Sequence, residues 1–144
     1  MATIELKPLA TMDIQLGDQV DLGAGPKGHR IVIDVTSVRL TADDFTAELA
    51  TNDAADWATF SEDGTLAALD VRATLKTEDG AFIYVEYGGR MDMNTGLLAT
   101  APTFQTSAER YLWLNRVQAV AAGEVNLETG VLVYTLYEAQ PVAG

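Results

Sequence analysis

The sequence predicts an all-β protein: a single antiparallel β-barrel of about eight to nine strands that follow one another as a meander. Segments rich in β-branched and aromatic residues recur along the chain. Glycine-ended turn motifs separate several of them. The chain has 144 residues, which suits one domain over 1–144 with a single core.

Four turn motifs share a final glycine. They are SEDG at 61–64, TEDG at 77–80, MNTG at 93–96 and LETG at 127–130. The first three glycines are 16 residues apart, a step that fits one strand plus one tight turn. Hairpin turns need a residue with positive φ, and glycine adopts that conformation without a steric cost. Each motif therefore predicts a hairpin turn.

The expected strands lie around these turns and show period-two character. They cover 31–40, 65–76, 81–90, 110–123 and 131–140, with shorter candidates at 11–17, 44–50 and 55–60. No segment is a convincing helix. So many strands remove their sheet edges most simply by closing into a barrel, and a two-layer sandwich is the alternative.

Three stretches are expected to be loops. Glycines and a proline interrupt 22–30, which predicts either a mobile loop at the mouth of the barrel or a plain connection. His29, in this stretch, is expected to be exposed. The other two loops are expected around 51–57 and over 91–109, where Pro102 stops a strand ladder.

The composition excludes several classes of function. The net charge of −12 at pH 7 repels nucleic-acid phosphates and anionic membranes, so neither is expected as a partner. No cysteine and one histidine are present, which excludes disulfides, thiolate zinc sites and the usual Ser-His clusters. We expect no metal and no cofactor, and chemistry that depends on carboxylates, tyrosines and arginines.

The N-terminal stretch MATIELKPLATMDIQLG lacks the basic start and apolar run of a secretory signal. No stretch approaches the roughly 20 apolar residues of a membrane span. We therefore expect a soluble cytoplasmic protein.

Two of the expected strands are apolar on both faces. In 111–120 aromatic and aliphatic residues occupy odd and even positions alike, and 131–137 repeats the pattern. A strand buried on both sides needs partners on both sides. One explanation is a barrel whose interior holds a small molecule and whose outer wall packs against a second copy, so we expect a homodimer.

The hairpin over 69–90 carries the candidate catalytic residues. Asp70 and Arg72 alternate with aliphatic residues on its first strand, and Tyr84 lies on the second. If these charges face the interior, they meet the phenol there. An arginine, a carboxylate and a phenol together can bind an enolate and move a proton. The alternative is that Asp70 and Arg72 form an ordinary solvated face.

Several motifs resemble a known family in order and over most of the chain. They are GPKGHR (25–30), ADW (55–57), DG (63–64), LDVRATLKTEDGAFIYVEYGGR (69–90), PTFQT (102–106) and RYLWLNRVQAV (110–120). They resemble the domain of unknown function 3237 family, also called uncharacterised protein family 0311. The resemblance implies one barrel-like all-β domain and assigns no general reaction. The matching motif positions are Arg30, Trp57, Asp70, Arg72, Asp79, Gly80, Tyr84, Tyr111, Trp113 and Asn115.

Because Asp and Arg recur two apart in the family motif, the resemblance favours an inward orientation of Asp70 and Arg72. We predict that Asp70, Arg72 and Tyr84 are catalytic. The predicted substrate-binding residues are Arg30, Trp57, Tyr87, Arg90, Tyr111, Trp113 and Asn115. The predicted function is a cofactor-independent lyase, isomerase or cyclase for a small aromatic or polyketide-like compound held in an interior pocket. The alternatives are a non-catalytic ligand-binding protein and a structural or partner-binding domain.

Overall fold

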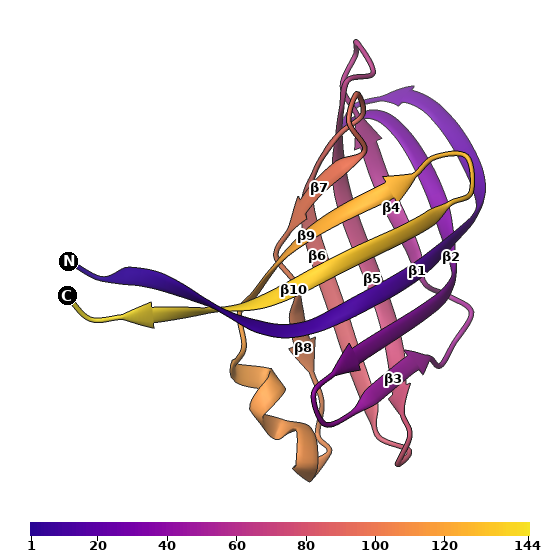
Figure 1. Cartoon of the computed structure of the whole chain (residues 1–144). Coiled ribbons are helices and arrows are strands. Elements are labelled where there is room, and N and C mark those ends of the chain that lie inside the picture. The colour runs from indigo at the N-terminus through magenta and orange to yellow at the C-terminus, as the bar shows by residue number, and fades with distance from the viewer.

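The computed structural model describes residues 1–144 and is built almost entirely of β-strands (Figure 1). The elements are β1 (Thr3–Gly25), β2 (Gly28–Ala42), β3 (Thr46–Leu49), β4 (Ala55–Phe60), β5 (Leu66–Thr77), β6 (Phe82–Asp92), β7 (Leu97–Thr100), β8 (Thr103–Gln105), the 3₁₀-helix η1 (Glu109–Arg116), β9 (Ala119–Asn126) and β10 (Val131–Val142). No helix in the chain has the length and hydropathy needed to span a bilayer.

Eight of the ten strands close into a ring. Its order is β1, β2, β4, β5, β6, β7, β9 and β10, and β10 pairs back with β1. Every pairing is antiparallel, and closure removes the free sheet edges. The predicted barrel is confirmed. The two short strands lie outside this ring order: β3 bridges β2 and β5, and β8 pairs with β6.

The four glycine turns fall where the sequence predicts them. They join β4 to β5, β5 to β6, β6 to β7 and β9 to β10. Each of the four glycines, Gly64, Gly80, Gly96 and Gly130, has a φ between 73° and 87°. An L-residue with a side chain rarely adopts this conformation, so glycine fixes where each strand ends.

The prediction of a strand over 110–123 is wrong for its first half. Residues Glu109–Arg116 form η1, and β9 begins only at Ala119. Tyr111 and Leu114 are three apart and therefore share one side of a 3₁₀-helix, where both are buried. A run that is apolar at odd and even positions alike fits a helical period as well as a strand, so periodicity did not separate the two.

The three expected loops are more ordered than predicted. In 22–30, β1 continues to Gly25 and β2 starts at Gly28, so the stretch is a tight hairpin rather than a mobile loop. The stretch 91–109 contains β7 and β8, and β4 already begins at residue 55. Irregular pairing in β1, between Asp21 and Gly23, absorbs the glycines without ending the strand.

Helix η1 lies at the lower end of the barrel, below β8, in Figure 1, and its Tyr111 and Leu114 side chains are buried. The Tyr111 ring packs edge-on against Phe45, with 5.0 Å between centroids, and its hydroxyl donates to Asp79 at 2.7 Å. Asn115 accepts a hydrogen bond from the backbone N–H of Thr106 and donates one to its carbonyl, both at 2.9 Å. The helix is therefore fixed to the β2–β3 turn, the β5–β6 turn and the segment after β8.

Candidate functional site

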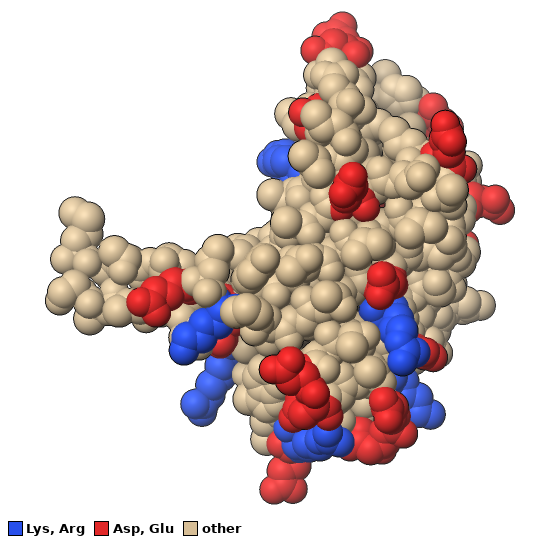
Figure 2. Space-filling view, in the orientation of Figure 1, with Lys and Arg blue, Asp and Glu red and all other residues tan.

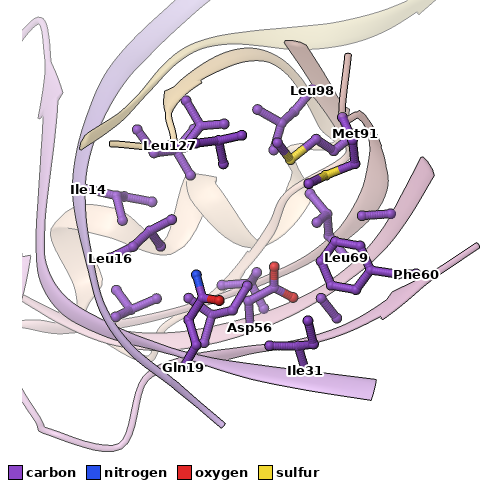
Figure 3. Close-up of a pocket in the computed structure, with 18 of the residues that line it drawn as sticks. Ile14, Leu16, Gln19, Ile31, Asp56, Phe60, Leu69, Met91, Leu98 and Leu127 are labelled. Carbon is purple, nitrogen blue, oxygen red and sulfur yellow. The ribbon is translucent and has the colours of Figure 1, made fainter. Parts of the chain in front are cut away.

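The barrel interior contains a cavity of about 480 Å³ above the packed core. It opens at the end where the hairpins β1–β2, β4–β5, β6–β7 and β9–β10 turn, since residues from all four line it. Of its 24 lining residues, 18 are hydrophobic. Figure 3 shows Asp56 among apolar neighbours such as Ile31 and Leu69. Volume and lining are those of a site for a small, mainly apolar molecule.

Strand alternation decides which side chains line this cavity. Successive residues of a strand point to opposite sides, so each strand of the ring offers every second residue to the interior. The lining from β2 and β5 illustrates the rule, with Ile31, Ile33, Val35, Ala67, Leu69 and Val71. The residues between them face outward.

Asp56 is the buried carboxylate of this cavity. It is 7% exposed, and its carboxyl group points into the apolar interior (Figure 3). The pairing of β4 with β5 is interrupted between the pair Asp56–Val71 and the pair Thr59–Ala68. In this interruption the Asp56 Oδ1 accepts the backbone N–H of Asp70 at 3.0 Å. The carboxylate thus has one fixed hydrogen bond and a second oxygen free for a ligand.

Burial raises the pKa of Asp56 from 3.8 to about 6. The backbone N–H of Asp70 opposes this rise, the negative charge of Asp70 adds to it, and the positive charge of Arg30 opposes it. At neutral pH the carboxylate is mainly ionised, yet its pKa lies close to the working pH. Those are the properties of an effective general base.

Two buried tyrosines from opposite parts of the ring share the cavity with Asp56. Tyr87 of β6 and Tyr134 of β10 meet edge-on, with ring centroids 5.5 Å apart. Burial raises the pKa of both phenols, and the charge of Asp56 raises each further. Both hydroxyls therefore stay protonated at neutral pH and can donate hydrogen bonds.

The Tyr134 hydroxyl is fully buried; the Tyr87 phenol acts on it as a donor, whereas the O–H of Tyr134 itself has no acceptor in the chain. A buried polar group without a partner is unfavourable, and native proteins contain few of them. Gly123, directly opposite on β9, makes room for this ring, because a Cβ there would lie 2.5 Å from it. The arrangement offers an unsatisfied donor to an oxygen atom of a bound molecule.

The mouth of the cavity is polar. His29, Gln19 and Glu62 line it, and the Nε2 of His29 lies 2.6 Å from Asp21 Oδ1. The backbone N–H of Gly23 and then the His29 ring hold the pKa of Asp21 below its usual value. His29 is therefore half-buried at the rim rather than simply exposed.

The expected inward orientation of Asp70 and Arg72 is wrong. Both side chains are exposed on the outer face of β5, because the neighbouring Leu69 and Val71 face the cavity. Burying aliphatic side chains is favourable, whereas burying two charges is not. On the outer face, the Arg72 guanidinium lies over the Trp57 ring, 4.6 Å from its centroid.

The other predicted site residues also lie outside the cavity, with one exception. Arg30 donates to the Trp57 carbonyl oxygen at 2.5 Å on the outer wall, and the Tyr84 hydroxyl donates to Glu86 at 3.0 Å. Arg90 lines a groove on the outside of the barrel. Tyr111, Trp113 and Asn115 belong to η1. Tyr87 alone among the ten predicted residues lines the cavity.

Asp56 and Tyr134 line the cavity but were not predicted as site residues. A usable signal existed for Asp56, because it shares its strand face with Ala58 and Phe60 and so is a lone carboxylate on an apolar face. Tyr134 likewise alternates on one face with Leu132 and Leu136. Neither pattern predicts which face of β4 or of β10 points into the barrel.

Comparisons with known proteins agree with this fold. A family model described as "Protein of unknown function (DUF3237)" matches residues 4–139. The chain is 25% identical to a β-barrel-like protein of Acinetobacter baumannii, with a TM-score of 0.82 over 96% of this chain and 97% of the other. A protein of unknown function from Rhodopseudomonas palustris gives a TM-score of 0.85 at 21% identity, covering 96% and 99%.

A third solved structure is described as an enzyme from Penicillium herquei. It is 23% identical, with a TM-score of 0.69, and the match covers 96% of this chain and 95% of that one. No curated protein matches the chain.

Proposed function

Because the chain belongs to the DUF3237 family, which is described as being of unknown function, we propose its function from the geometry of the cavity. The proposal is that the barrel binds a small, mainly apolar molecule bearing a carbonyl or enolisable oxygen and catalyses proton transfer on it. The observation that carries this proposal is that the buried carboxylate Asp56 lines the same cavity as Tyr134, whose O–H has no acceptor in the chain. Isomerases, lyases and cyclases all use such a step.

The proposed reaction begins when Tyr134 donates a hydrogen bond to the carbonyl oxygen of the ligand. Asp56 then removes a proton from the adjacent carbon, and the C–H electron pair forms a C=C bond while the carbonyl π electrons move to oxygen. The resulting enolate is stabilised by the phenol in a water-poor site. Return of the proton to a different carbon gives an isomer, and loss of a leaving group from the carbon next to the enolate gives a lyase product. Attack of the enolate carbon on a second carbonyl carbon of the same molecule gives a ring, with the carbonyl π electrons moving to its oxygen, which then takes up the proton.

The lining of the cavity supports a proposal for the class of substrate. Its apolar majority favours an aromatic or polyketide-like skeleton, and the carboxylates of Asp56 and Glu62 disfavour an anion. We therefore propose a neutral ligand whose oxygen-bearing end lies at Tyr134. The enzyme from Penicillium herquei shares the fold, so the fold is compatible with catalysis.

Exchange of carbon-bound protons provides the test. The bicyclic aromatic ketone β-tetralone is small enough for the cavity, and its α-protons exchange with deuterium oxide at a rate that proton NMR follows. We expect the protein to accelerate this exchange. Asp56→Asn should abolish the acceleration, and Tyr134→Phe should reduce it by about 10²-fold, the typical effect of losing one oxyanion donor.

Tyr84→Phe is the matched control, because this phenol lies on the outer wall. It should exchange β-tetralone at the wild-type rate. Exchange that is equally fast in Asp56→Asn and in wild type would overturn the proposed base.

A non-catalytic binding protein is the second candidate, favoured by the same apolar lining. Its distinguishing result is tight binding of the neutral probe β-naphthol, measured calorimetrically, without any acceleration of exchange. Tyr134→Phe would then weaken only the binding.

We also propose that the chain acts as a homodimer. Support comes from the outer face of the barrel, where Val131 and Val133 of β10 and Leu97 of β7 are 42%, 43% and 54% exposed. The apolar second face of β10 expected from the sequence is thus free to contact another copy. The cytoplasmic location stays a prediction.

A further inference from the structure

Strands β1 and β10 continue beyond the ring as a two-stranded arm. The arm consists of residues 3–7 paired with 138–142, from Thr3–Val142 to Lys7–Glu138. It stands clear of the barrel body in Figures 1 and 2. An isolated pair of strands is marginally stable in water without further packing. The arm's own chain offers little such packing, because Ile4 and Leu6 remain 60% and 56% exposed.

An apolar groove lies on the barrel wall at the root of this arm. It holds about 470 Å³ and is lined by Leu6, Gly88, Gly89, Arg90, Ala99, Thr100, Ala101, Val120, Ala121, Ala122 and Tyr137. Glycines and alanines form its floor, so another strand pair can approach the wall closely. Arm and groove share Leu6 and are therefore one continuous surface.

We propose that two copies of this chain exchange arms, so that the arm of each copy docks into the groove of the other. Because arm and groove adjoin, a twofold axis beside Leu6 satisfies both contacts at once, as an isologous interface requires. This inference specifies the interface of the homodimer proposed above and rests on that proposal.

Size and charge both favour a second copy as the partner. The arm and the groove together comprise about twenty residues, within the usual 20–30 residues a side of a stable interface. The arm carries Glu5, Lys7 and Glu138, and the groove carries Arg90. The arm is thus net negative and the groove net positive. The arm and the groove together have no net charge, although the whole chain has a net charge of −12. Two copies that meet at this surface therefore repel each other less than at the acidic parts of the barrel.

The first experiment measures the dimer dissociation constant by sedimentation of the full chain. Leu6→Glu in the arm and Ala122→Arg in the groove should each weaken the dimer by about tenfold or more. Leu22→Glu, an equally exposed position on the other end of β1, should leave the constant unchanged. Circular dichroism confirms that each variant is folded.

The second experiment locates the arm. Because the chain has no cysteine, only introduced thiols react. Copies with Ile4→Cys are mixed with isotopically labelled copies with Ala99→Cys and treated with a short bis-maleimide. Mass spectrometry should find cross-links between light and heavy copies, and far fewer when Leu22→Cys replaces Ala99→Cys.

Three outcomes are decisive. A wild-type chain that stays monomeric at high concentration overturns both the dimer and the arm exchange. A dimer that resists both Leu6→Glu and Ala122→Arg, or that gives no cross-link above the Leu22→Cys level, overturns the arm exchange alone. Weakening by both variants together with the specific cross-link supports the exchange.

Discussion

At the scale of single residues, Asp56 is the base of the proposed reaction, because it is the buried carboxylate of the cavity. Its carboxylate is held by the backbone N–H of Asp70, and the Asp70 side chain points away to the outside. Asp70, which the sequence motif singles out, thus contacts the cavity through its backbone N–H, and the side chain that lines the cavity is that of Asp56 on the neighbouring strand.

Asp56 should make stability depend on pH. Its folded pKa of about 6 lies above the unfolded value of 3.8, so the folded state binds the proton more tightly. The free energy of unfolding therefore falls by roughly 3 kcal/mol as pH rises from about 4 through about 6. Asp56→Asn removes this loss, so in urea unfolding it should be the more stable protein at about pH 8 and equal to wild type at about pH 4.

The exposed Asp18→Asn is the control for this measurement. It should not flatten the pH dependence. An Asp56→Asn curve parallel to wild type across the whole range would show that this carboxyl is not destabilised by burial.

Gly123 is the second residue that the cavity depends on. In Gly123→Ala the new Cβ would lie 2.5 Å from the Tyr134 ring, and the ring must move. We expect a loss of about 1–3 kcal/mol in unfolding free energy and weaker binding of β-naphthol. Gly25→Ala, where a Cβ meets nothing within 4 Å, should change neither. Unchanged stability in Gly123→Ala would contradict the close packing of this ring.

At the scale of elements, η1 makes the two ends of the barrel different, because it packs at one end only. It brings Tyr111 and Leu114 into the core at 2% and 1% exposure, and its hydrogen bonds fix it to two turns and to the segment after β8. The helix thus packs against the core at the lower end, whereas the cavity is lined by residues of the hairpins at the other end.

Leu114 and Leu112 form a matched pair on η1, since they are 1% and 46% exposed. Leu114→Ala leaves a void at the lower end and should cost about 2–5 kcal/mol. Leu112→Ala should stay within about 0.5 kcal/mol of wild type. Chemical denaturation measures both, and equal losses would mean that the helix does not pack against the core.

At the scale of the whole molecule, the barrel carries a large negative charge. The net charge is −12 on 144 residues, and Figure 2 shows acidic side chains spread over the barrel surface. Repulsion among them destabilises the compact state and is screened by salt.

Thermal stability should therefore rise with ionic strength. Between about 10 mM and about 1 M chloride the Debye length falls from about 30 to about 3 Å. We expect the unfolding midpoint to rise by several degrees in differential scanning calorimetry, and by the same amount with sodium or choline as the cation. A midpoint that falls, or that depends on the cation, would argue against simple screening.

From the sequence alone come most of the long strands, their glycine turns and the closed barrel, because alternation and positive-φ glycines are local properties; β7 and β8, which lie within 91–109, were not predicted. It also indicated two apolar faces on β10. It did not separate η1 from a strand, since the apolar run over 111–120 fits both periods.

Only the tertiary structure decided which face of each strand is the interior. Alternation divides β5 into a face with Asp70 and Arg72 and a face with Leu69 and Val71. Which of the two points into the barrel follows from the apolar area that the whole ring buries. The candidate site has the same origin. Asp56, Tyr87 and Tyr134 come from β4, β6 and β10, far apart in the chain, and ring closure alone places them around one cavity.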